Sequence, residues 1–306
     1  MIKIVSIGHA SYDIYIQVED FPKEGVRERY VNKLGVGGGD AGNVAYLLGK
    51  WGVSTTFAGV VGNDVFGTRI RKEFESVGID LRYLETSYEK DTTISFIFSN
   101  LKNQSHTIFN VADEYVKLKK FDFDFQPDLI FVDGHDPYAS KSTIERFPKA
   151  ISIVAANRYN ADIVGICSMA NYIVCSVAFA EAVTKIKVDY NNPKTLVNLY
   201  DELRKKFENQ VVVVTLGEHG ALYMVENNIK VSPAIKVKVV DSSIARSVFY
   251  GAFCYGVAAG FDLEKTIKYA NITAGLSTQY IGTRKAIPKL DEVTRLYEKN
   301  SWSIYC

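Results

Sequence analysis

The chain alternates short β-branched segments with segments of helical periodicity, and this alternation constrains its fold more than any other feature. Strands that alternate with helices predict parallel strands joined by crossover helices. The expected strands are Ile2–Ile7, Thr55–Val60, Leu129–Val132, Ile151–Val154, Tyr172–Cys175 and Val211–Thr215. The expected helices are Gly42–Trp51, Val65–Val77, Lys194–Glu208, Val248–Ala259 and Leu263–Thr278. We therefore predict an α/β fold with a doubly wound, mostly parallel sheet and helices on both faces.

Two stretches depart from this rhythm and alternate apolar with polar residues, as antiparallel strands do. They are Asp13–Val18 with Arg29–Lys33, and Thr92–Asn100 with Ser105–Val111. No internal repeat and no linker rich in Pro, Gly or Ser divides the chain. We expect a single domain over residues 1–306, with a small separate sheet built from about residues 12–33 and 91–111.

The charge and cysteine content narrow the classes of function. The chain has 36 Lys and Arg against 35 Asp and Glu, which gives no global reason to bind nucleic acid or an anionic membrane. Apolar stretches are shorter than the roughly 18 residues of a membrane span, and the N-terminus has a strand pattern rather than a signal-peptide pattern. The four cysteines form no CxxC, and neither the His nor the Cys spacing indicates a metal site. We expect a reduced, cytoplasmic protein that acts on a small molecule.

A glycine-rich segment, Gly37-Gly38-Gly39-Asp40-Ala41-Gly42-Asn43, leads into the first expected helix. Glycines at such a place let the backbone turn tightly and approach a ligand closely. A flexible turn before a helix explains the glycines alone equally well. The surrounding pattern is more specific, because Ala45, Gly52 and Gly62 follow at fixed distances.

The pattern Gly38-Gly39-x-Ala41-x-Asn43-x-Ala45, with Gly52 and Gly62, resembles the first signature of the ribokinase-like (PfkB) carbohydrate kinases. The resemblance continues along the chain in Gly8 with Asp13, Gly62-x-Asp64-x-x-Gly67, Asp133-Gly134, Thr215-x-Gly217-x-x-Gly220 and Asp241-Ser242-Ser243. It implies an α/β domain whose β-sheet lid covers a sugar or nucleoside. It also implies that ATP with Mg²⁺ binds beside the carboxyl edge of the sheet.

The resemblance assigns substrate binding to Asp13, Gly38, Gly39 and Asn43. A carboxylate suits paired sugar hydroxyls, and an amide offers both donors and an acceptor to the same polyol. An aspartate that caps a turn is the alternative for Asp13.

The resemblance assigns nucleotide binding to Thr215, Gly217 and Gly220, which follow a run of valines at a strand end, where open sheets bind ligands. We expect His219, inside that turn, to be a solvated loop residue.

The second signature of the family is altered here. The family reads Asp-Thr-Thr-Gly-Ala-Gly-Asp, in which the last Asp is the base and the glycine amides hold phosphate charge, whereas this chain reads Asp241-Ser242-Ser243-Ile244-Ala245-Arg246-Ser247. Ser247 cannot act as a carboxylate base, and we expect it to cap the following helix. Ile244 and Arg246 add Cβ atoms where glycines form the anion site, although Arg246 can offer charge instead.

Two further places differ in the same direction. The family often has Asn-x-x-Glu after the strand Tyr172–Cys175, where it helps to organise Mg²⁺, and this chain has Ser176-Val177-Ala178-Phe179. An Asp is common after Ile151–Val154, and here Ala155-Ala156-Asn157 follow. Carboxylates are therefore replaced at three places on a scaffold that is otherwise kept, so we expect Mg-ATP to bind weakly.

Two hypotheses remain open. One is an ATP-dependent kinase that phosphorylates a sugar or nucleoside hydroxymethyl group with a substitute for the missing Asp base. The other, which the substitutions favour, is a catalytically impaired pseudokinase that binds a sugar or nucleotide. A dinucleotide oxidoreductase is a distant third, because no GxGxxG follows the first strand. Exposed edges of a lid sheet are compatible with a homodimer through the lids.

Overall fold

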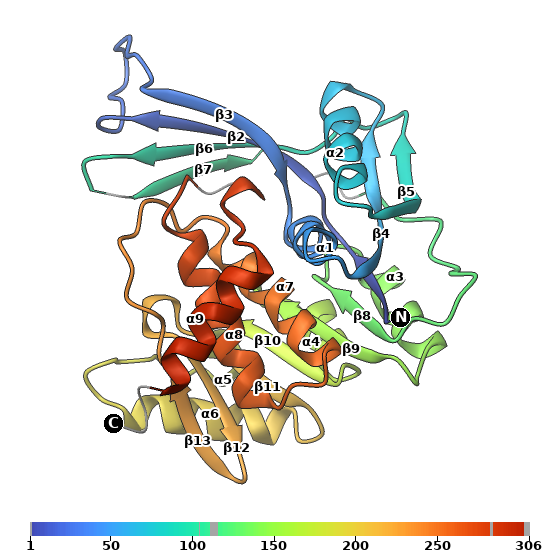
Figure 1. Cartoon of the computed structure of the whole chain (residues 1–306), viewed down its shortest axis with the longest axis vertical. Coiled ribbons are helices and arrows are strands. Elements are labelled where there is room, and N and C mark those ends of the chain that lie inside the picture. Colours follow the sequence, from blue (N-terminus) through green and yellow to red (C-terminus); the bar gives the residue numbers. More distant parts are fainter. Residues whose placement is uncertain (1, 104, 111–115, 282–283, 303–306) are drawn as a thin grey trace.

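The computed structural model describes residues 2–103, 105–110, 116–281 and 284–302, and its strands form two sheets (Figure 1). The large sheet has nine strands in the order β13-β12-β11-β10-β9-β8-β1-β4-β5. Its strands are β1 (Lys3–Ile7), β4 (Ser54–Gly62), β5 (Asp80–Ser87), β8 (Leu129–Val132), β9 (Ile151–Ala156), β10 (Tyr172–Ser176), β11 (Val211–Thr215), β12 (Ala221–Val225) and β13 (Asn228–Ser232). Strands β12 and β13 are antiparallel additions at one edge, and the other neighbours pair in parallel. The predicted fold class is confirmed.

Helices cover both faces of the large sheet, so its central strands are buried on both sides. In β1, Ile4 contributes to one hydrophobic core and Val5 to the other, because successive side chains of a strand point to opposite faces. One core includes residues of α1 (Asp40–Lys50), α2 (Val65–Glu75), α7 (Ala245–Ala258), α8 (Leu263–Ser277) and α9 (Leu290–Trp302). The other includes residues of α3 (Pro137–Arg146), α4 (Ala161–Cys167), α5 (Val177–Thr184) and α6 (Lys194–Lys206). No helix within the described ranges is long and apolar enough to cross a membrane.

Local sequence accounts for where α2 begins and what it buries. The Asp64 carboxylate accepts hydrogen bonds from the Phe66 and Gly67 amides at 2.8 Å each, which satisfies two of the donors that every helix start leaves free. Ile70 and Phe74, four residues apart on one face, are fully buried in the core beside the sheet. Asp64 also accepts from the Thr92 amide at 2.6 Å, so it joins α2 to the chain entering the small sheet.

The small sheet projects beyond the large one and has the order β3-β2-β6-β7 (Figure 1). Its strands are β2 (Ser11–Val18), β3 (Asn32–Gly38), β6 (Ile94–Asn100) and β7 (His106–Asn110). The expectation of purely antiparallel strands is wrong for β2 and β6, which pair in parallel. Strand β2 follows β1 and strand β6 follows β5. Because β1 and β5 run in the same direction, β2 and β6 both start from the same edge of the large sheet. Val111, the expected end of this sheet, lies outside the described residues.

Candidate functional site

Glycines bring the turn after β1 against the start of α1. A Cβ at Gly38 would lie 2.1 Å from the Asp13 carboxylate, and one at Gly39 would lie 2.3 Å from the His9 carbonyl oxygen. Gly39 also has a φ of 82°, in the region that glycine adopts most easily. The glycine-rich segment is therefore needed first for close packing of backbone and carboxylate, and this packing sets Asp13 beside the N-terminus of α1.

Asp13 is 9% exposed and lies in the middle of β2. The Ser11 hydroxyl donates to its Oδ1 at 2.9 Å. Burial raises the pKa of Asp13 above its usual value, and hydrogen bonds from Ser11 and Ser95 act in the opposite direction. Asp13 is therefore a buried acceptor rather than a residue that caps an exposed turn.

Asn43 joins α1 to α7. Its Nδ2 donates to the Ser247 hydroxyl at 3.1 Å, and its Oδ1 accepts from Arg284 Nε at 3.2 Å. An amide has two donors and two acceptor lone pairs, so one of each remains for a ligand. The sequence predicted Asn43 as a binding residue, and the structure fixes the orientation of its amide from two sides.

Arg284 is a residue of this cluster that sequence reasoning missed. It lies in the short helix η2 (Arg284–Ala286), is 1% exposed, and makes an ion pair with Glu73 at 2.8 Å. Its Nη2 donates to the Gly38 carbonyl oxygen at 3.2 Å, and its guanidinium lies 4.6 Å from the Phe74 ring centroid. Nothing in the sequence distinguishes it from the next residue, Lys285, which is exposed.

Ser247, which the resemblance places at the position of the family's base, carries a buried hydroxyl. Ser247 is 3% exposed, and its Oγ donates to the Ile244 carbonyl oxygen at 3.0 Å while accepting from Asn43. The expectation that Ser247 caps α7 is wrong, because α7 begins at Ala245 and Ser247 lies within its first turn. Its hydroxyl bonds backwards to a carbonyl of the same turn, as Ser often does inside helices.

Ile244 and Arg246, which the resemblance places at the anion-site glycine positions, contact other parts of the protein. The Ile244 side chain is 5% exposed and belongs to the hydrophobic core, while the Ala245 amide donates to the Ser242 carbonyl oxygen at 3.1 Å. Arg246 Nη2 lies 4.0 Å from Oδ2 of Asp40, the first residue of α1. Asn157, which follows β9, donates to the same carboxylate oxygen at 2.7 Å.

The small sheet contacts the altered second signature at two points. The Tyr15 and Ser243 hydroxyls lie 2.9 Å apart, and His106 Nε2 lies 3.4 Å from Asp241 Oδ1. Tyr15 is 1% exposed, and its contact with Ser243 is partly buried. Strands β2 and β7 are thereby held against the segment that precedes α7.

The predicted nucleotide turn follows β11, at the carboxyl edge of the large sheet. Gly217, in the short helix η1 (Gly217–His219), has a φ of 62° and open space around its Cα, whereas a Cβ at Gly220 would lie 2.0 Å from the Ser232 carbonyl oxygen. Thr215 Oγ1 donates to the Cys175 carbonyl oxygen at 3.2 Å. His219 is partly exposed and stacks on Tyr190, with ring centroids 3.8 Å apart.

The place after β10 offers no carboxylate to a metal ion. No group of three His, Cys, Asp or Glu side chains able to hold a metal ion occurs in the part of the chain that the structure describes. Ser176 caps α5 by accepting from the Phe179 amide at 3.1 Å, and Phe179 is buried, so this place supplies no carboxylate. Any Mg²⁺ would have to be held chiefly by the phosphates of its nucleotide.

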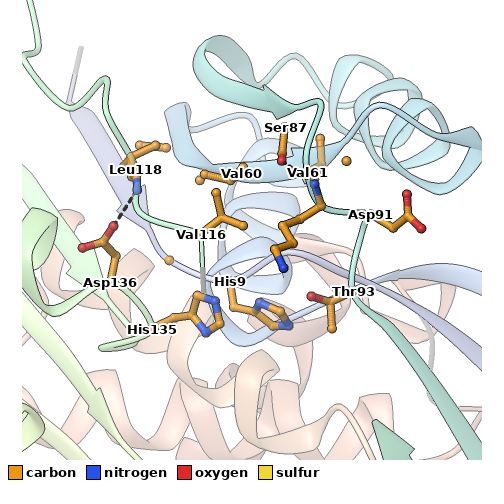
Figure 2. A pocket seen from close by; sticks show the side chains of 15 residues that line it. His9, Val60, Val61, Ser87, Asp91, Thr93, Val116, Leu118, His135 and Asp136 are labelled. Carbon is orange, nitrogen blue, oxygen red and sulfur yellow. Dashed lines mark hydrogen bonds between the residues drawn. The ribbon is translucent and has the colours of Figure 1, made fainter. Parts of the chain in front are cut away.

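A small open pocket of about 40 Å³ lies at the carboxyl ends of β1, β4 and β8 (Figure 2). His9 and His135 lie side by side in it, with ring centroids 4.3 Å apart. Asp133 holds this region together, because its Oδ2 accepts from the His9 amide at 2.9 Å and from the Ala41 amide at 3.1 Å. The pocket is therefore joined through Asp133 to the start of α1.

Comparisons with known proteins identify the family and agree with the fold. The family described as pfkB family carbohydrate kinase matches residues 1–290. A ribokinase from Lactococcus lactis is 25% identical over 319 aligned residues that cover 100% of both chains. A structure described as a putative ribokinase from Agrobacterium tumefaciens has a TM-score of 0.87 at 20% identity and covers 97% of both chains. Arabidopsis thaliana ribokinase complexed with ribose and ATP has a TM-score of 0.79 at 18% identity, over 97% of this chain and 98% of that chain.

Proposed function

This chain belongs to the pfkB family of carbohydrate kinases, and we propose that it binds a sugar or nucleoside together with an adenine nucleotide but transfers phosphate very slowly. The observation that carries the proposal is the state of Ser247. Its hydroxyl proton is donated to the Ile244 carbonyl oxygen in a buried turn, at the position where the family has a carboxylate base. A hydroxyl in that state cannot accept the proton of an attacking sugar hydroxyl.

The substrate side keeps what a polyol needs. Asp13 offers a buried carboxylate, and Asn43 retains one donor and one acceptor after its contacts with Ser247 and Arg284. Both side chains are less than a tenth exposed, so a sugar reaches them only when the small sheet moves away from the segment before α7. The small sheet therefore acts as a lid in this proposal.

Pairing of two copies through the small sheet is the assembly that we propose. Ile108 and Phe109 of β7 are each 53% exposed, and an exposed edge strand with apolar side chains favours association. Sedimentation equilibrium should give twice the mass of one chain. A monomer at all concentrations would contradict this assembly without affecting the binding proposal.

A second candidate, an active kinase with a substitute base, is favoured by one observation. Asp40 is a carboxylate at the start of the facing helix α1, and burial raises its pKa above the usual value, as a general base requires. Its Oδ2, however, already accepts from Asn157 and faces Arg246. We therefore prefer the binding function.

Calorimetry with a panel of pentoses, hexoses and nucleosides tests the binding function. We expect one of them to bind, and Asp13→Ala should weaken that binding by about 1–3 kcal/mol because charge-assisted hydrogen bonds are lost. Asp20→Ala is the matched control, since Asp20 is an exposed aspartate just beyond the end of the same strand. If nothing in the panel binds at millimolar concentration, or if both variants bind equally, Asp13 does not mark a sugar pocket.

A further inference from the structure

We propose that Asp40 is an internal counter-anion for Arg246 and that it makes this site select against the terminal phosphate of ATP. The inference rests on the proposed nucleotide-binding function and concerns its specificity. It begins from two adjacent contacts between α1 and α7, Asp40 with Arg246 and, one turn further along α1, Asn43 with Ser247. These contacts bring the N-termini of the two helices together.

Asp40 belongs to a closed hydrogen-bonded cluster. Asn157 Nδ2 donates to Asp40 Oδ2 at 2.7 Å, and the Tyr250 hydroxyl donates to Asn157 Oδ1 at 2.5 Å. Tyr250 is fully buried in α7, so it fixes the Asn157 amide and, through it, the carboxylate. The position of Asp40 is therefore set by three elements, α1, the turn after β9, and α7.

The charge balance of this cluster is unusual for a site meant to receive phosphate. The free amides of a helix N-terminus attract anions, and a guanidinium beside them would add to that attraction. Here the chain supplies its own anion, because the Asp40 carboxylate stands at the start of α1 and faces the Arg246 guanidinium. The Asp40 carboxylate thus balances the positive charge of Arg246 within the protein. A phosphate that approaches Arg246 is repelled by this carboxylate.

Burial and a neighbouring carboxylate disfavour the charged form of Asp40. Burial raises the pKa of Asp40, and Asp133, which lies after β8, raises it further. Arg246, the Asn157 hydrogen bond and Arg158 act in the opposite direction without cancelling the effect. Protonation of Asp40 removes the resident negative charge, so the affinity for ATP should rise as the pH falls through the raised pKa of Asp40.

Calorimetry with ATP, ADP and adenosine at fixed Mg²⁺ tests the inference on the full chain. We expect Asp40→Asn to raise the affinity for ATP about tenfold, the affinity for ADP less, and the affinity for adenosine not at all. Asp162→Asn is the matched control, because Asp162 lies in the first turn of α4, is exposed, and makes an ion pair with Lys141. The wild-type chain titrated from neutral to mildly acidic pH gives the same test without a substitution, with the Asp40→Asn variant correcting for protonation of the nucleotide.

The outcomes separate the inference from the function on which it rests. Equal ATP affinity in wild type and Asp40→Asn, with adenosine bound by both, overturns the inference and leaves the nucleotide site intact. Failure of all three ligands to bind any variant overturns both. A wild-type chain that transfers phosphate and loses this activity in Asp40→Asn also overturns the inference, because Asp40 would then be the base.

Discussion

Replacing Arg284 with methionine should destabilise the fold by about 3 kcal/mol, because an ion pair in the interior is broken on one side only. Arg284 is 1% exposed, and its removal leaves the Glu73 carboxylate, among the residues that the structure describes, with only the Gly37 amide as a close donor, at 3.0 and 3.1 Å. The side chain of Glu73 is 26% exposed, which places the estimate at the lower end of the range for buried pairs. Methionine retains much of the apolar contact with Phe74, so the loss measures the charged contacts.

Thermal unfolding followed by circular dichroism measures this loss. In a chain of this size about 3 kcal/mol corresponds to a fall in Tm of about 6 °C. Lys285→Met, at the exposed neighbouring position, should leave Tm within about 1 °C of wild type. A double-mutant cycle gives a further test. The double variant Glu73→Gln with Arg284→Met should lose less free energy of unfolding than the sum of the losses in the two single variants. An Arg284→Met variant as stable as Lys285→Met would refute the view that this arginine holds the glycine-rich segment and Asn43 in place.

Two further outcomes follow from named contacts. Hydrogen bonds from Thr92 and Gly67 lower the pKa of Asp64 although partial burial opposes them, so Asp64→Ala should cost about 2 kcal/mol of stability at neutral pH. That deficit should shrink as the pH falls through the lowered pKa, and urea unfolding that shows a constant deficit down to acid pH would contradict the assignment. Reverting Ile244→Gly, Arg246→Gly and Ser247→Asp together should raise kinase turnover far more than the sum of the single reversions, which a coupled ADP-release assay measures.

The strands that the sequence predicted best are those buried on both faces. Leu129–Val132 and Val211–Thr215 were predicted with the observed bounds, because continuous β-branched runs between turn residues have few alternatives. The hairpin of β12 and β13 was missed. Its turn uses Glu226 and Asn227, with φ values of 51° and 61°, and contains no glycine to mark it.

The sequence predicted site residues only at positions that match a signature motif of the family. Asp13 and Asn43 were predicted from the resemblance to the kinase family, and the structure brings both to the turn between β3 and α1. The role of Arg284 depends on a contact across 241 positions of sequence, and the pairing of Asp40 with Arg246 depends on two helices that meet only in the folded chain. Long-range pairing of charges leaves no local periodicity from which it can be read.

The central claim is that Ser247 cannot replace the carboxylate base of the family. The turnover of the unmodified protein tests this claim most directly. A coupled ADP-release assay with Mg-ATP and each sugar or nucleoside that binds should give less than about 0.01 per second, since loss of a general base alone lowers rates by about 10²–10⁴. Turnover in the ordinary enzyme range of roughly 1–10³ per second would contradict the account. The Ser247 hydroxyl donates to the Ile244 carbonyl oxygen. Fast turnover would therefore mean that another group of the protein removes the proton.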